Sequence, residues 1–583
     1  MIEERFTSCF HPFVIPFLAG MGFVLAVCFI KAMKVIWQLE RKDRGRFFLS
    51  LLKPNLIIKN TIDIILDCLI HVKLWRRNRM LGFMHSSIAF GWFMIILLGH
   101  IEVMMWCPER LKTFYYPIFF DYFLDGGQFT FISRLSDAFL LVIIAGILLA
   151  VIKRFWSKLF GMKHTARPSL FNLIGLVSLW AIFPLRLLAE QCARAGNLSV
   201  APWWAYSIAL CAFMVVLPFT RYLHIPAEML LILMRNAGMS VTQPGKGLAR
   251  VQADTCPNCG VCIDACPMNA DPANLKDSTV YLTRQLRRGN QERVKEISDK
   301  CMLCGKCTSV CQVGVDGPKL RILARAARKY KIGPDFSQSA VGATETVSAE
   351  GKVLYFAGCM TQLTPKIGRS VVSILSKAGI GYEWMDRDGG LCCGRPLHTA
   401  GRLKEAAELI RRNEEAIMRS GAHTLLVSCP ICYREFKEKY KLPGIRVVHY
   451  ADYFCELADK GLLHIEKGET CYVFHDPCEL GRGCGIYETP RRLIYSAAAI
   501  AEAPKNRAES ICCGGSLGSL SLDFEHREKI TLAALSNLYL SKADAIATAC
   551  PLCFTTFARY SDRPVKDIAQ IVDEQTQINS TIS

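Results

Sequence analysis

Four groups of cysteines in the second half of the chain have the spacing for metal and redox chemistry. Of the 27 cysteines in the 583-residue sequence, eighteen belong to these groups. The first two groups each read C-x-x-C-x-x-C-x-x-x-C, which wraps a cubane iron–sulfur cluster, and in two-cluster ferredoxins the fourth cysteine of each run serves the other cluster. Two [4Fe–4S] clusters are therefore expected, one on Cys256, Cys259, Cys262 and Cys311, the other on Cys301, Cys304, Cys307 and Cys266. Structural zinc is the alternative, but its paired C-x-x-C units would leave thiols spare.

The other two groups spell C…CCG…CPxC twice and are the candidate catalytic thiols. Each cysteine of the first copy recurs about 120 residues later in the second, as expected of an internal repeat. The first copy contributes Cys359, Cys392, Cys393, Cys429 and Cys432, and the second Cys478, Cys512, Cys513, Cys550 and Cys553. Five thiols are an odd number for one cubane or for zinc. An adjacent pair such as Cys392–Cys393 points its side chains in different directions and could bridge two irons.

Short strands that alternate with helices must position these thiols. Residues 353–359 and 472–478 each read as an apolar strand ending in cysteine, and 425–432 and 545–553 each as a strand followed by C-P-x-C and a helix. This alternation predicts parallel α/β units, whose carboxyl strand ends would bring the thiols together. The expected order is a helical, ferredoxin-like 2[4Fe–4S] domain, a linker and two α/β cysteine-rich domains, at 236–330, 331–350, 351–465 and 466–570.

The first half of the chain is too apolar for an ordinary soluble domain. Hydrophobic residues make up 51% of the sequence, and the mean hydropathy is +0.23. Five apolar runs can cross the roughly 30 Å hydrocarbon core, at about 13–37, 81–106, 136–156, 168–190 and 203–224. They predict an all-α, five-helix transmembrane domain over 1–235. The amino terminus lacks the basic region of a signal peptide, so the first span is expected to be retained.

Basic loops predict the orientation of this domain. Residues 39–80 carry ten Lys or Arg, whereas 107–135 carry three, and basic loops stay in the cytoplasm. We expect a multi-pass protein of the inner (cytoplasmic) membrane with its amino terminus outside and its iron–sulfur domains in the cytoplasm, where disulfides are rare. The net charge of +19 suits anionic membrane lipid or an acidic partner. It does not indicate nucleic acid, because no nucleic-acid module accompanies it. Residues 54–71 have the pattern of an amphipathic helix on the inner surface.

Histidines in the membrane half are candidate haem ligands. His85 begins span two and His224 ends span five, so both are expected at the inner face, where two imidazoles could hold one haem iron. No C-x-x-C-H occurs in this half, so the haem would be b-type. The alternative is a pair of interfacial histidines that only form hydrogen bonds. His100 lies about 22 Å farther along the helix and could hold a second haem with His11, or a quinol or proton site with Glu102.

The membrane half resembles a known family. Five spans, a histidine in span two and the ending Pro218-Phe-Thr-Arg-Tyr-Leu-His224 resemble the cytochrome b subunit of respiratory nitrate reductase. That family carries two b haems and reacts with quinone, so the resemblance implies one haem on His85 and His224. Span five of this chain lacks the outer histidine of the family, so the resemblance does not extend to a second haem.

The remaining part, about residues 250–560, is similar to the catalytic subunit of heterodisulfide reductase and to related glycolate oxidase and lactate-utilisation subunits. The matching phrases are Gly-Cys359-Met, Cys392-Cys-Gly394, His475-Asp-Pro-Cys478 and Cys512-Cys-Gly-Gly515. In heterodisulfide reductase such domains hold non-cubane [4Fe–4S] clusters that cleave a disulfide one electron at a time. The resemblance therefore implies two non-cubane clusters here. Cys471 and Cys484 compete with Cys478, which we rank first by repeat spacing; we expect Cys455, Cys471 and Cys484 to be ordinary buried thiols.

Together the parts resemble a fused membrane heterodisulfide reductase, a group that includes electron-transfer-flavoprotein:menaquinone oxidoreductases. The resemblance implies an oxidoreductase that passes electrons between a cytoplasmic redox protein and membrane quinone, either menaquinone or ubiquinone. That partner would be an electron-transfer flavoprotein or a dehydrogenase subunit. Two alternatives stay open: a quinol-linked disulfide reductase, and a non-catalytic wiring subunit of a larger dehydrogenase. No Rossmann-type glycine fingerprint occurs, so flavin or nicotinamide is expected on a partner.

Overall fold

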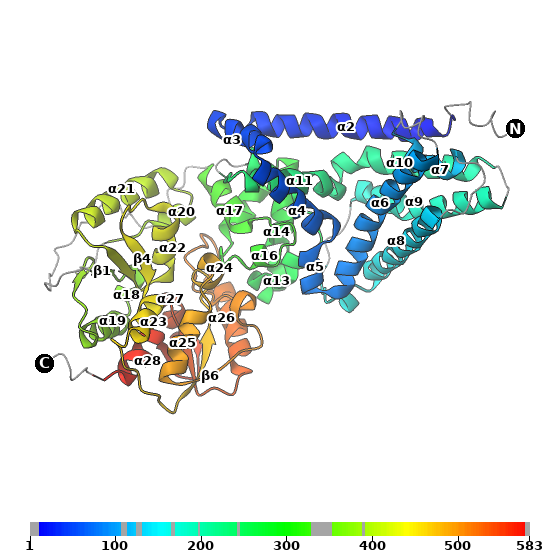
Figure 1. Ribbon diagram of the computed structural model, residues 1–583. Helices are drawn as coiled ribbons and strands as arrows, with labels where there is room; N and C mark the ends of the chain where they lie inside the picture. The colour runs from blue at the N-terminus through cyan, green and yellow to red at the C-terminus, as the bar shows by residue number, and fades with distance from the viewer. Residues whose placement is uncertain are drawn as a thin grey trace. The chain divides into compact units, whose positions relative to one another are not determined.

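The chain folds into two compact units. The computed structural model in Figure 1 describes residues 11–106, 114–123, 131–164, 169–195, 199–241, 245–327, 353–387 and 391–577. The first unit comprises Met1–Asp264, Leu286–Gly289 and Cys311–Val315, and the second Ala265–Gln285, Asn290–Val310 and Asp316–Ser583. The expected linker at 331–350 lies outside the described residues.

Five long apolar helices dominate the first unit and confirm the predicted membrane-spanning class. Each is long and apolar enough to cross a membrane. They are α2 (Val14–Trp37), α6 (Arg79–Trp106), α8 (Phe131–Phe155), α9 (Leu170–Arg194) and α10 (Ala201–Val216). Large apolar side chains such as Leu25, Phe29 and Ile30 are exposed on α2. Exposure on this scale suits a lipid environment rather than water.

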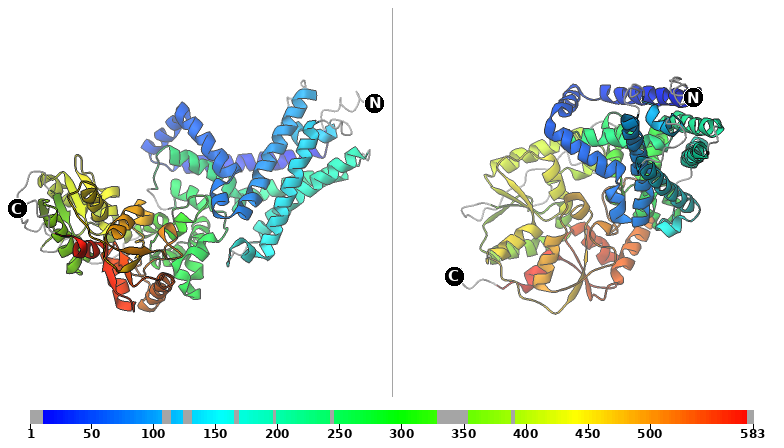
Figure 2. Two further views of the ribbon diagram at one scale, coloured as in Figure 1. Left: turned by 60° about the horizontal axis from the view of Figure 1, so that its bottom comes forward. Right: turned by 45° about the vertical axis from the view of Figure 1, so that its right-hand side comes forward.

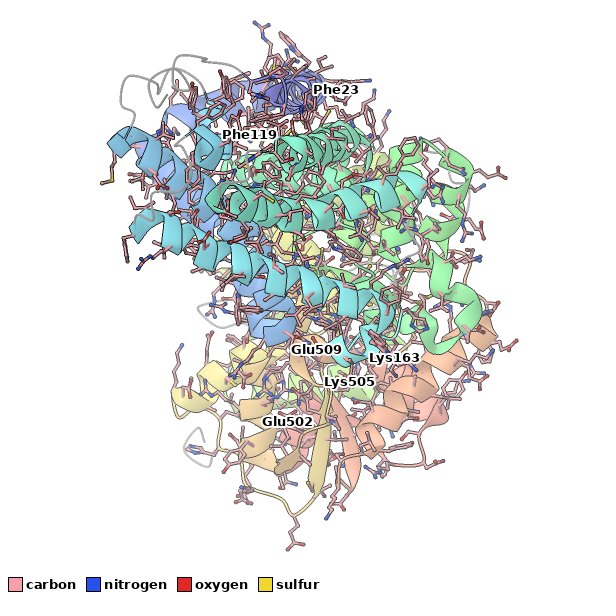
Figure 3. The ribbon with its side chains drawn as sticks, turned by 90° about the vertical axis from the view of Figure 1, so that its right-hand side faces the viewer. Phe23, Phe119, Lys163, Glu502, Lys505 and Glu509 are labelled. Atoms are coloured by element: carbon pink, nitrogen blue, oxygen red, sulfur yellow. The ribbon has the colours of Figure 1, made fainter. Side chains whose placement is uncertain are left out.

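Aromatic packing joins these helices at one end. Phe13 precedes α2, Phe17 lies on α2 and Trp203 lies on α10. All three rings contact Phe119 of the short helix α7 (Tyr116–Phe123). Their centroids are 5.4, 5.6 and 6.1 Å from that of Phe119. Phe119 is fully buried, whereas Phe23 on α2 is 39% exposed; both are labelled in Figure 3. The contrast separates an interior packing face from an outward apolar face.

The fifth span is shorter than the sequence pattern predicted. The apolar run extends to 224, but α10 ends at Val216 and is followed by two 3₁₀ turns, η4 (Leu217–Phe219) and η5 (Arg221–Leu223). Pro218 cannot donate the helical hydrogen bond at its position, and Thr220 between the turns is extended. His224 therefore begins a separate helix, α11 (His224–Asn236), instead of ending the span.

Shorter helices complete the first unit. Residues 54–71, predicted to be amphipathic, form a helix that continues into one π-helical turn, and Ile57, Ile58 and Ile62 on it are exposed while Asn60 is buried. The elements are α3 (Arg41–Leu52), α4 (Pro54–Ile64), η1 (Ile65–Leu69), α5 (Val72–Arg77), η3 (Ser157–Phe160) and α12 (Leu248–Thr255). An exposed apolar face with buried polar groups matches a helix that lies on a membrane surface.

The second unit contains two copies of one four-stranded parallel sheet, as Figures 1 and 2 show. The strand orders are β2-β1-β3-β4 and β6-β5-β7-β8. The first sheet consists of β1 (Val353–Phe356), β2 (Tyr382–Trp384), β3 (Thr424–Val427) and β4 (Arg446–His449). The second consists of β5 (Cys471–His475), β6 (Ala499–Ala501), β7 (Ala545–Thr548) and β8 (Val565–Asp567). The duplicated α/β architecture predicted from the cysteine repeat is confirmed.

Helices connect and cover the parallel strands. The first copy has α18 (Cys359–Gln362), α19 (Pro365–Lys377), α20 (Arg395–Thr399), α21 (Leu403–Arg419), α22 (Pro430–Lys439) and α23 (Tyr450–Asp459). The second has α24 (Gly481–Cys484), α25 (Glu488–Ala497), η8 (Arg507–Glu509), α26 (Phe524–Tyr539), α27 (Pro551–Tyr560) and α28 (Ile568–Gln575). The central strands β1 and β7 are buried along their whole length, and β3 and β5 at all but their first residue, as in sheets covered on both faces.

The segment between the membrane helices and the sheets is helical in its described part. Its elements are α13 (Val261–Ala265), η6 (Pro267–Ala270), η7 (Pro272–Asp277), α14 (Thr279–Arg288), α15 (Gln291–Asp299), α16 (Lys306–Ser309) and α17 (Gly317–Ala326). The short turns of this segment carry the eight ferredoxin-type cysteines. Its residues are divided between the two units.

Candidate functional site

The first unit gathers three thiols of the first ferredoxin run and the last thiol of the second. This set is Cys256, Cys259, Cys262 and Cys311. The pKa of Cys311 is raised to about 12, mainly by burial and also by the thiols of Cys256 and Cys259. Burial likewise raises the pKa of Cys259, while the cations of Lys153 and Arg77 lower it. The four sulfurs thus form the set expected for a cubane cluster, with positive charge nearby.

The second unit gathers the complementary four thiols. This set is Cys266, Cys301, Cys304 and Cys307. The pKa of Cys266 is raised, first by burial and then by its three neighbours Cys301, Cys304 and Cys307. Cys311 thus lies within electrostatic range of Cys256 and Cys259, and Cys266 within that of Cys301, Cys304 and Cys307.

Tight turns shape both ferredoxin runs. The backbone of Asn258 and Gly260 in the first run, and of Leu303 and Gly305 in the second, has φ of 56°, 88°, 54° and 74°. Glycine adopts positive φ without strain, but a leucine there costs on the order of 1–3 kcal/mol. The turn at Leu303 aims its N–H at the Cys301 sulfur, 3.3 Å away. Donors aimed at sulfur suit a site that must hold several thiolates.

The five thiols of the first cysteine-rich copy form a continuous chain of contacts. Cys359 contacts Cys392, Cys393 contacts both Cys392 and Cys432, and Cys432 contacts Cys429. The hydrogen bonds from Cys392 and Cys432 lower the pKa of Cys393 to about 6. A thiol with a depressed pKa is readily available as the thiolate that binds iron.

The second copy repeats this chain thiol by thiol. Cys512 contacts Cys478 and Cys513, and Cys513 contacts Cys553, with 3.3 Å between the last two sulfurs. Cys553 also contacts Cys550. The contacts with Cys512 and Cys553 hold the pKa of Cys513 well below its usual value. In both copies the second cysteine of the C-C pair is therefore the one favoured as a thiolate.

Strand ends and helix starts position these thiols. Cys359 and Cys478 follow β1 and β5, while Cys429 and Cys550 are the N-cap residues of α22 and α27. A proline begins each of these two helices, and the partial positive charge of a helix amino terminus favours thiolates. Gly358 precedes the first thiol at φ 85°, and a Cβ there would lie 2.9 Å from the Cys432 sulfur. Only glycine leaves that space to the thiol array.

The second ferredoxin set lies against the second cysteine-rich set. Hydrogen bonding to Cys512 is the main reason that the pKa of Cys304 is lowered to about 6, and Arg482 and Lys306 lower it further. Arg482 donates through Nε to the carbonyl of Cys304 at 2.8 Å, and Lys306 pairs with Glu509, labelled in Figure 3, at 3.4 Å. The two thiol sets are thus in direct contact, so clusters bound to them would lie close together.

Three histidines gather in the first unit, one of them missed by sequence reasoning. His85 lies within electrostatic range of His71 and His224, and the rings of His71 and His85 are 5.5 Å apart. Nδ1 of His224 lies 2.7 Å from the carbonyl of Arg221, and Nδ1 of His71 lies 3.2 Å from that of Leu69. A histidine that donates one N–H to a carbonyl presents its other nitrogen to a metal.

The electrostatics of these histidines suit metal binding. The pKa of His224 is lowered to about 4, mainly by burial, and burial also lowers the pKa of His71. Both imidazoles are therefore neutral near pH 7, which is the form that binds iron. The only sequence signal for His71 was its place at the end of the amphipathic segment 54–71, where φ of 56° turns the chain toward span two.

The other two candidate haem ligands are not brought together. His100 is exposed on α6. His11 packs instead on Phe13 and Tyr122, with ring centroids 4.3 and 5.2 Å away. Within the described residues, no hydrogen bond or ring contact joins His11 to His100. Glu102, proposed beside His100, is buried.

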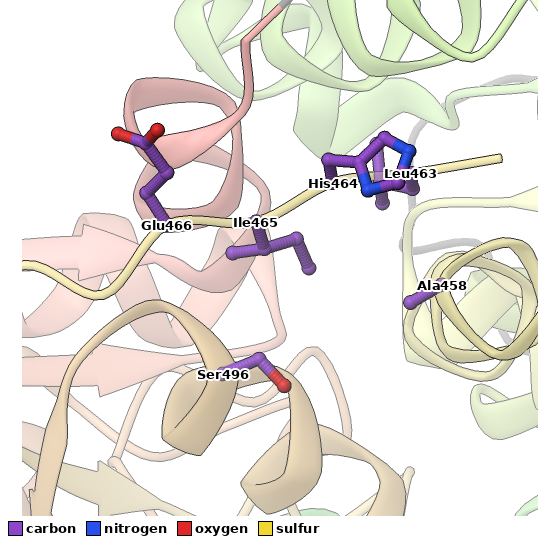
Figure 4. A pocket seen from close by; sticks show the side chains of 6 residues that line it. All are labelled: Ala458, Leu463, His464, Ile465, Glu466 and Ser496. Carbon is purple, nitrogen blue, oxygen red and sulfur yellow. The ribbon is translucent and has the colours of Figure 1, made fainter. Parts of the chain in front are cut away.

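The extra thiols and the surface pocket lie apart from the ligand sets. Cys478, not Cys471 or Cys484, is the thiol that contacts Cys512, and Cys455 donates to the carbonyl of Thr489 at 3.4 Å. Figure 4 shows a pocket in the second unit that no cysteine lines. Its lining residues are Ala458, Leu463, His464, Ile465, Glu466 and Ser496.

Known protein families match the thiol-bearing regions. A cysteine-rich domain family (CCG) matches residues 353–437 and 472–558, and a 4Fe-4S dicluster domain family matches residues 252–315. The chain is 28% identical to one component of the dihydromethanophenazine:CoB–CoM heterodisulfide reductase of Methanosarcina acetivorans, over 36% of this chain and 53% of that protein. Over residues 252–558 the chain therefore resembles heterodisulfide reductase subunits and carries a 4Fe-4S dicluster domain and two CCG cysteine-rich domains. All four thiol sets fall inside the matched ranges.

Two further relatives of this heterodisulfide reductase-like chain are named for quinone oxidoreduction and for a membrane anchor. It is 27% identical to an EtfAB:quinone oxidoreductase of Syntrophomonas wolfei, over 36% of this chain and 31% of that protein. It is 25% identical to a probable membrane-anchored ferredoxin of Chromohalobacter salexigens, over 35% of this chain and 32% of that protein. The aligned parts span less than two thirds of each relative. With its five apolar helices, the heterodisulfide reductase-like chain is a membrane protein.

Proposed function

We propose that the chain transfers electrons between a soluble redox protein and membrane quinone. The observation that carries this proposal is the contact between Cys304 of a ferredoxin set and Cys512 of a cysteine-rich set. Two redox-type thiol sets in direct contact form part of a conducting path, because electron transfer requires short distances between centres. The names of the relatives, quinone oxidoreductase and heterodisulfide reductase, agree with such a path.

The thiol sets fit iron–sulfur clusters by their chemistry. Each set offers four or five thiols, and in the two five-thiol sets neighbouring sulfurs are in contact. Bound clusters of this kind accept and release single electrons. The ferredoxin sets suit two cubane [4Fe–4S] clusters, and the five-thiol sets suit two non-cubane ones.

The covalent chain itself links the two ferredoxin sets. Cys262 serves one set and Cys266 the other, and they are only four residues apart in sequence. Four residues span at most roughly 14 Å even when fully extended. The ligands proposed for the two clusters are thus joined by a short stretch of chain.

The histidines of the first unit fit one b-type haem. His224 holds its Nδ1 against the Arg221 carbonyl, which leaves Nε2 for iron. His85 supplies the second imidazole of the proposed pair, and His71 lies beside it. A haem held between two imidazoles supplies one-electron chemistry. Because His11 and His100 do not meet, we propose a single haem.

The substrate at the membrane end is a quinone, menaquinone or ubiquinone. Under the positive-inside rule the amino terminus lies outside the cytoplasmic membrane and the thiol sets lie in the cytoplasm. The soluble partner is an electron-transfer flavoprotein or a comparable dehydrogenase subunit, in line with the relative named EtfAB:quinone oxidoreductase.

A quinol-linked disulfide reductase is the second candidate. The observation that favours it is the completeness of both five-thiol sets, whose thiols follow the same contact order in the two copies. A pure conductor does not require two such sites. Bound disulfide would be reduced by two electrons and two protons to two thiols.

Spectroscopy of the purified protein distinguishes the two functions. The protein would be extracted from membranes, assayed for iron, sulfide and haem, and followed by EPR and visible absorption. Haem reduction on adding a reduced electron-transfer flavoprotein, and not reduced nicotinamide alone, supports the first function. A new paramagnetic signal induced by a disulfide supports the second. Absence of haem b from the intact protein would overturn the membrane end of the proposal.

A further inference from the structure

The residue three places before the first thiol differs between the two cysteine-rich copies. Phe356 ends β1 in the first copy, and His475 ends β5 in the second. Phe356 packs edge-on against Phe436, with ring centroids 4.9 Å apart at 82°. His475 packs in the same way against Phe557, at 4.7 Å and 83°. His475 therefore occupies the position in the second copy that Phe356 occupies in the first, and its ring carries two nitrogens in place of carbons.

This added nitrogen faces the second thiol set. A nitrogen of His475 and the sulfurs of Cys513 and Cys553 all lie within 4.8 Å of one another. The side chain is 3% exposed, and its Nε2 has no hydrogen-bond partner. A buried polar atom without a partner destabilises the folded protein, so a sulfur or iron atom at this site would complete its contacts.

The first copy indicates which contact is made. Its five thiols form the same contact chain as those of the second copy, with a phenylalanine in the matching slot. If five thiols complete the iron ligands in the first copy, the second copy needs no sixth ligand. We propose that the imidazole N–H of His475 donates a hydrogen bond to a sulfur of the second cluster, a contact that the first cluster lacks.

Such a contact makes the two sites unequal. A hydrogen bond to a cluster or thiolate sulfur stabilises the reduced, more negative state and raises the reduction potential. The second cluster is also the one beside the ferredoxin set, through Cys512 and Cys304. The histidine thus makes the site nearest the ferredoxin set the better electron acceptor of the pair. The inference requires iron on both cysteine-rich sets, but no particular quinone or partner.

Nitrogen hyperfine spectroscopy on the unaltered holoprotein tests the contact. The protein would be grown with ¹⁵N-histidine, poised so that the second cluster is paramagnetic, and measured by ENDOR. A weak ¹⁵N coupling that disappears in a labelled His475→Phe sample is expected. The strong coupling of an iron-bound nitrogen would overturn the hydrogen bond, and so would the absence of any coupling removed by the substitution.

Reciprocal substitutions test the consequence. His475→Phe should lower the midpoint potential of the second cluster only, and Phe356→His should raise that of the first only. Iron, sulfide and EPR spin counts in the same samples show that both clusters are still present. Unchanged potentials in both variants would overturn the inference. If the wild-type protein holds the clusters but does not react with quinol, the proposed function fails while this inference stands.

Discussion

The two cysteine-rich copies share a scaffold but have different surroundings. Their sheets have the same strand order, and their thiols follow the same contact chain. The second set touches Cys304 of a ferredoxin set, whereas in the described part of the chain no ferredoxin cysteine is recorded beside the first set. The two copies thus share one thiol arrangement, and under the proposed function the second copy is the one that would exchange electrons with the ferredoxin set.

A buried ion pair distinguishes the first copy. Arg395 follows the C-C-G motif and contacts Glu435 and Glu479 at 3.1 Å each. The matching residue of the second copy is Gly515, where a Cβ would lie 2.0 Å from the Thr556 hydroxyl. The residue after the C-C-G motif therefore forms ion pairs in the first copy, whereas in the second copy its backbone packs closely against Thr556.

Removal of single thiols is expected to change the cluster content of the two copies more than any other substitution. Cys512→Ala should abolish the second cysteine-rich cluster and leave the first, and Cys392→Ala should do the reverse, because each thiol bridges its neighbours. EPR and iron counts of the purified variants measure this. Loss of the same signal in both variants would show that the two sets do not hold separate clusters.

The ion pair of the first copy gives the next largest effect. Arg395→Met leaves the buried Glu435 carboxylate without its arginine partner and should destabilise the fold by about 3 kcal/mol. The thermal unfolding midpoint should fall accordingly. Arg411→Ala is the matched control, because its pairs with Glu408 and Glu415 are exposed and such pairs contribute about 0–1 kcal/mol. Equal midpoints for the two variants would contradict this assignment.

The helix caps at the last strands predict opposite pH responses in the two copies. His449 pairs with Val427 of β3, and Asp567 pairs with Thr548 of β7, and each caps the following helix. Burial raises the pKa of Asp567 from 3.8 to about 7 and lowers that of His449 from 6.5 to about 3. Stability from neutral Asp567 is lost as pH rises from about 4 to about 7. Stability from neutral His449 is lost as pH falls over a similar range.

Asp567→Asn isolates the second-copy response. The amide keeps an oxygen for the hydrogen bonds from Tyr450 and Ala569, at 2.7 and 3.0 Å, but it does not ionise. The variant should gain on the order of 4 kcal/mol over the wild type at pH 8 and little at pH 4. Unfolding midpoints measured across this range test it. A wild-type pH profile that the substitution leaves unchanged would contradict the raised pKa.

Local spacing predicted much of this molecule. Cluster ligands lie a few residues apart in tight turns, and membrane helices need long apolar runs, so both patterns are visible in sequence. The repeat also marked Cys478 over Cys471 and Cys484. The contact between Cys304 and Cys512 could not be predicted, because it joins residues that are far apart in the sequence. The break after Val216 and the place of His71 beside His85 likewise depend on tertiary packing, which periodicity does not encode.

The central claim is that the membrane histidines and the thiol sets form one conducting path. The most direct test follows cluster reduction by a menaquinol analogue in the intact protein in lipid nanodiscs, using freeze-quench EPR. The wild-type clusters should be reduced. In His224→Leu, which removes the proposed haem ligand but retains the iron–sulfur content, their reduction should be slowed at least tenfold, a barrier increase of about 1.4 kcal/mol or more. Equal rates in the two proteins would contradict the account.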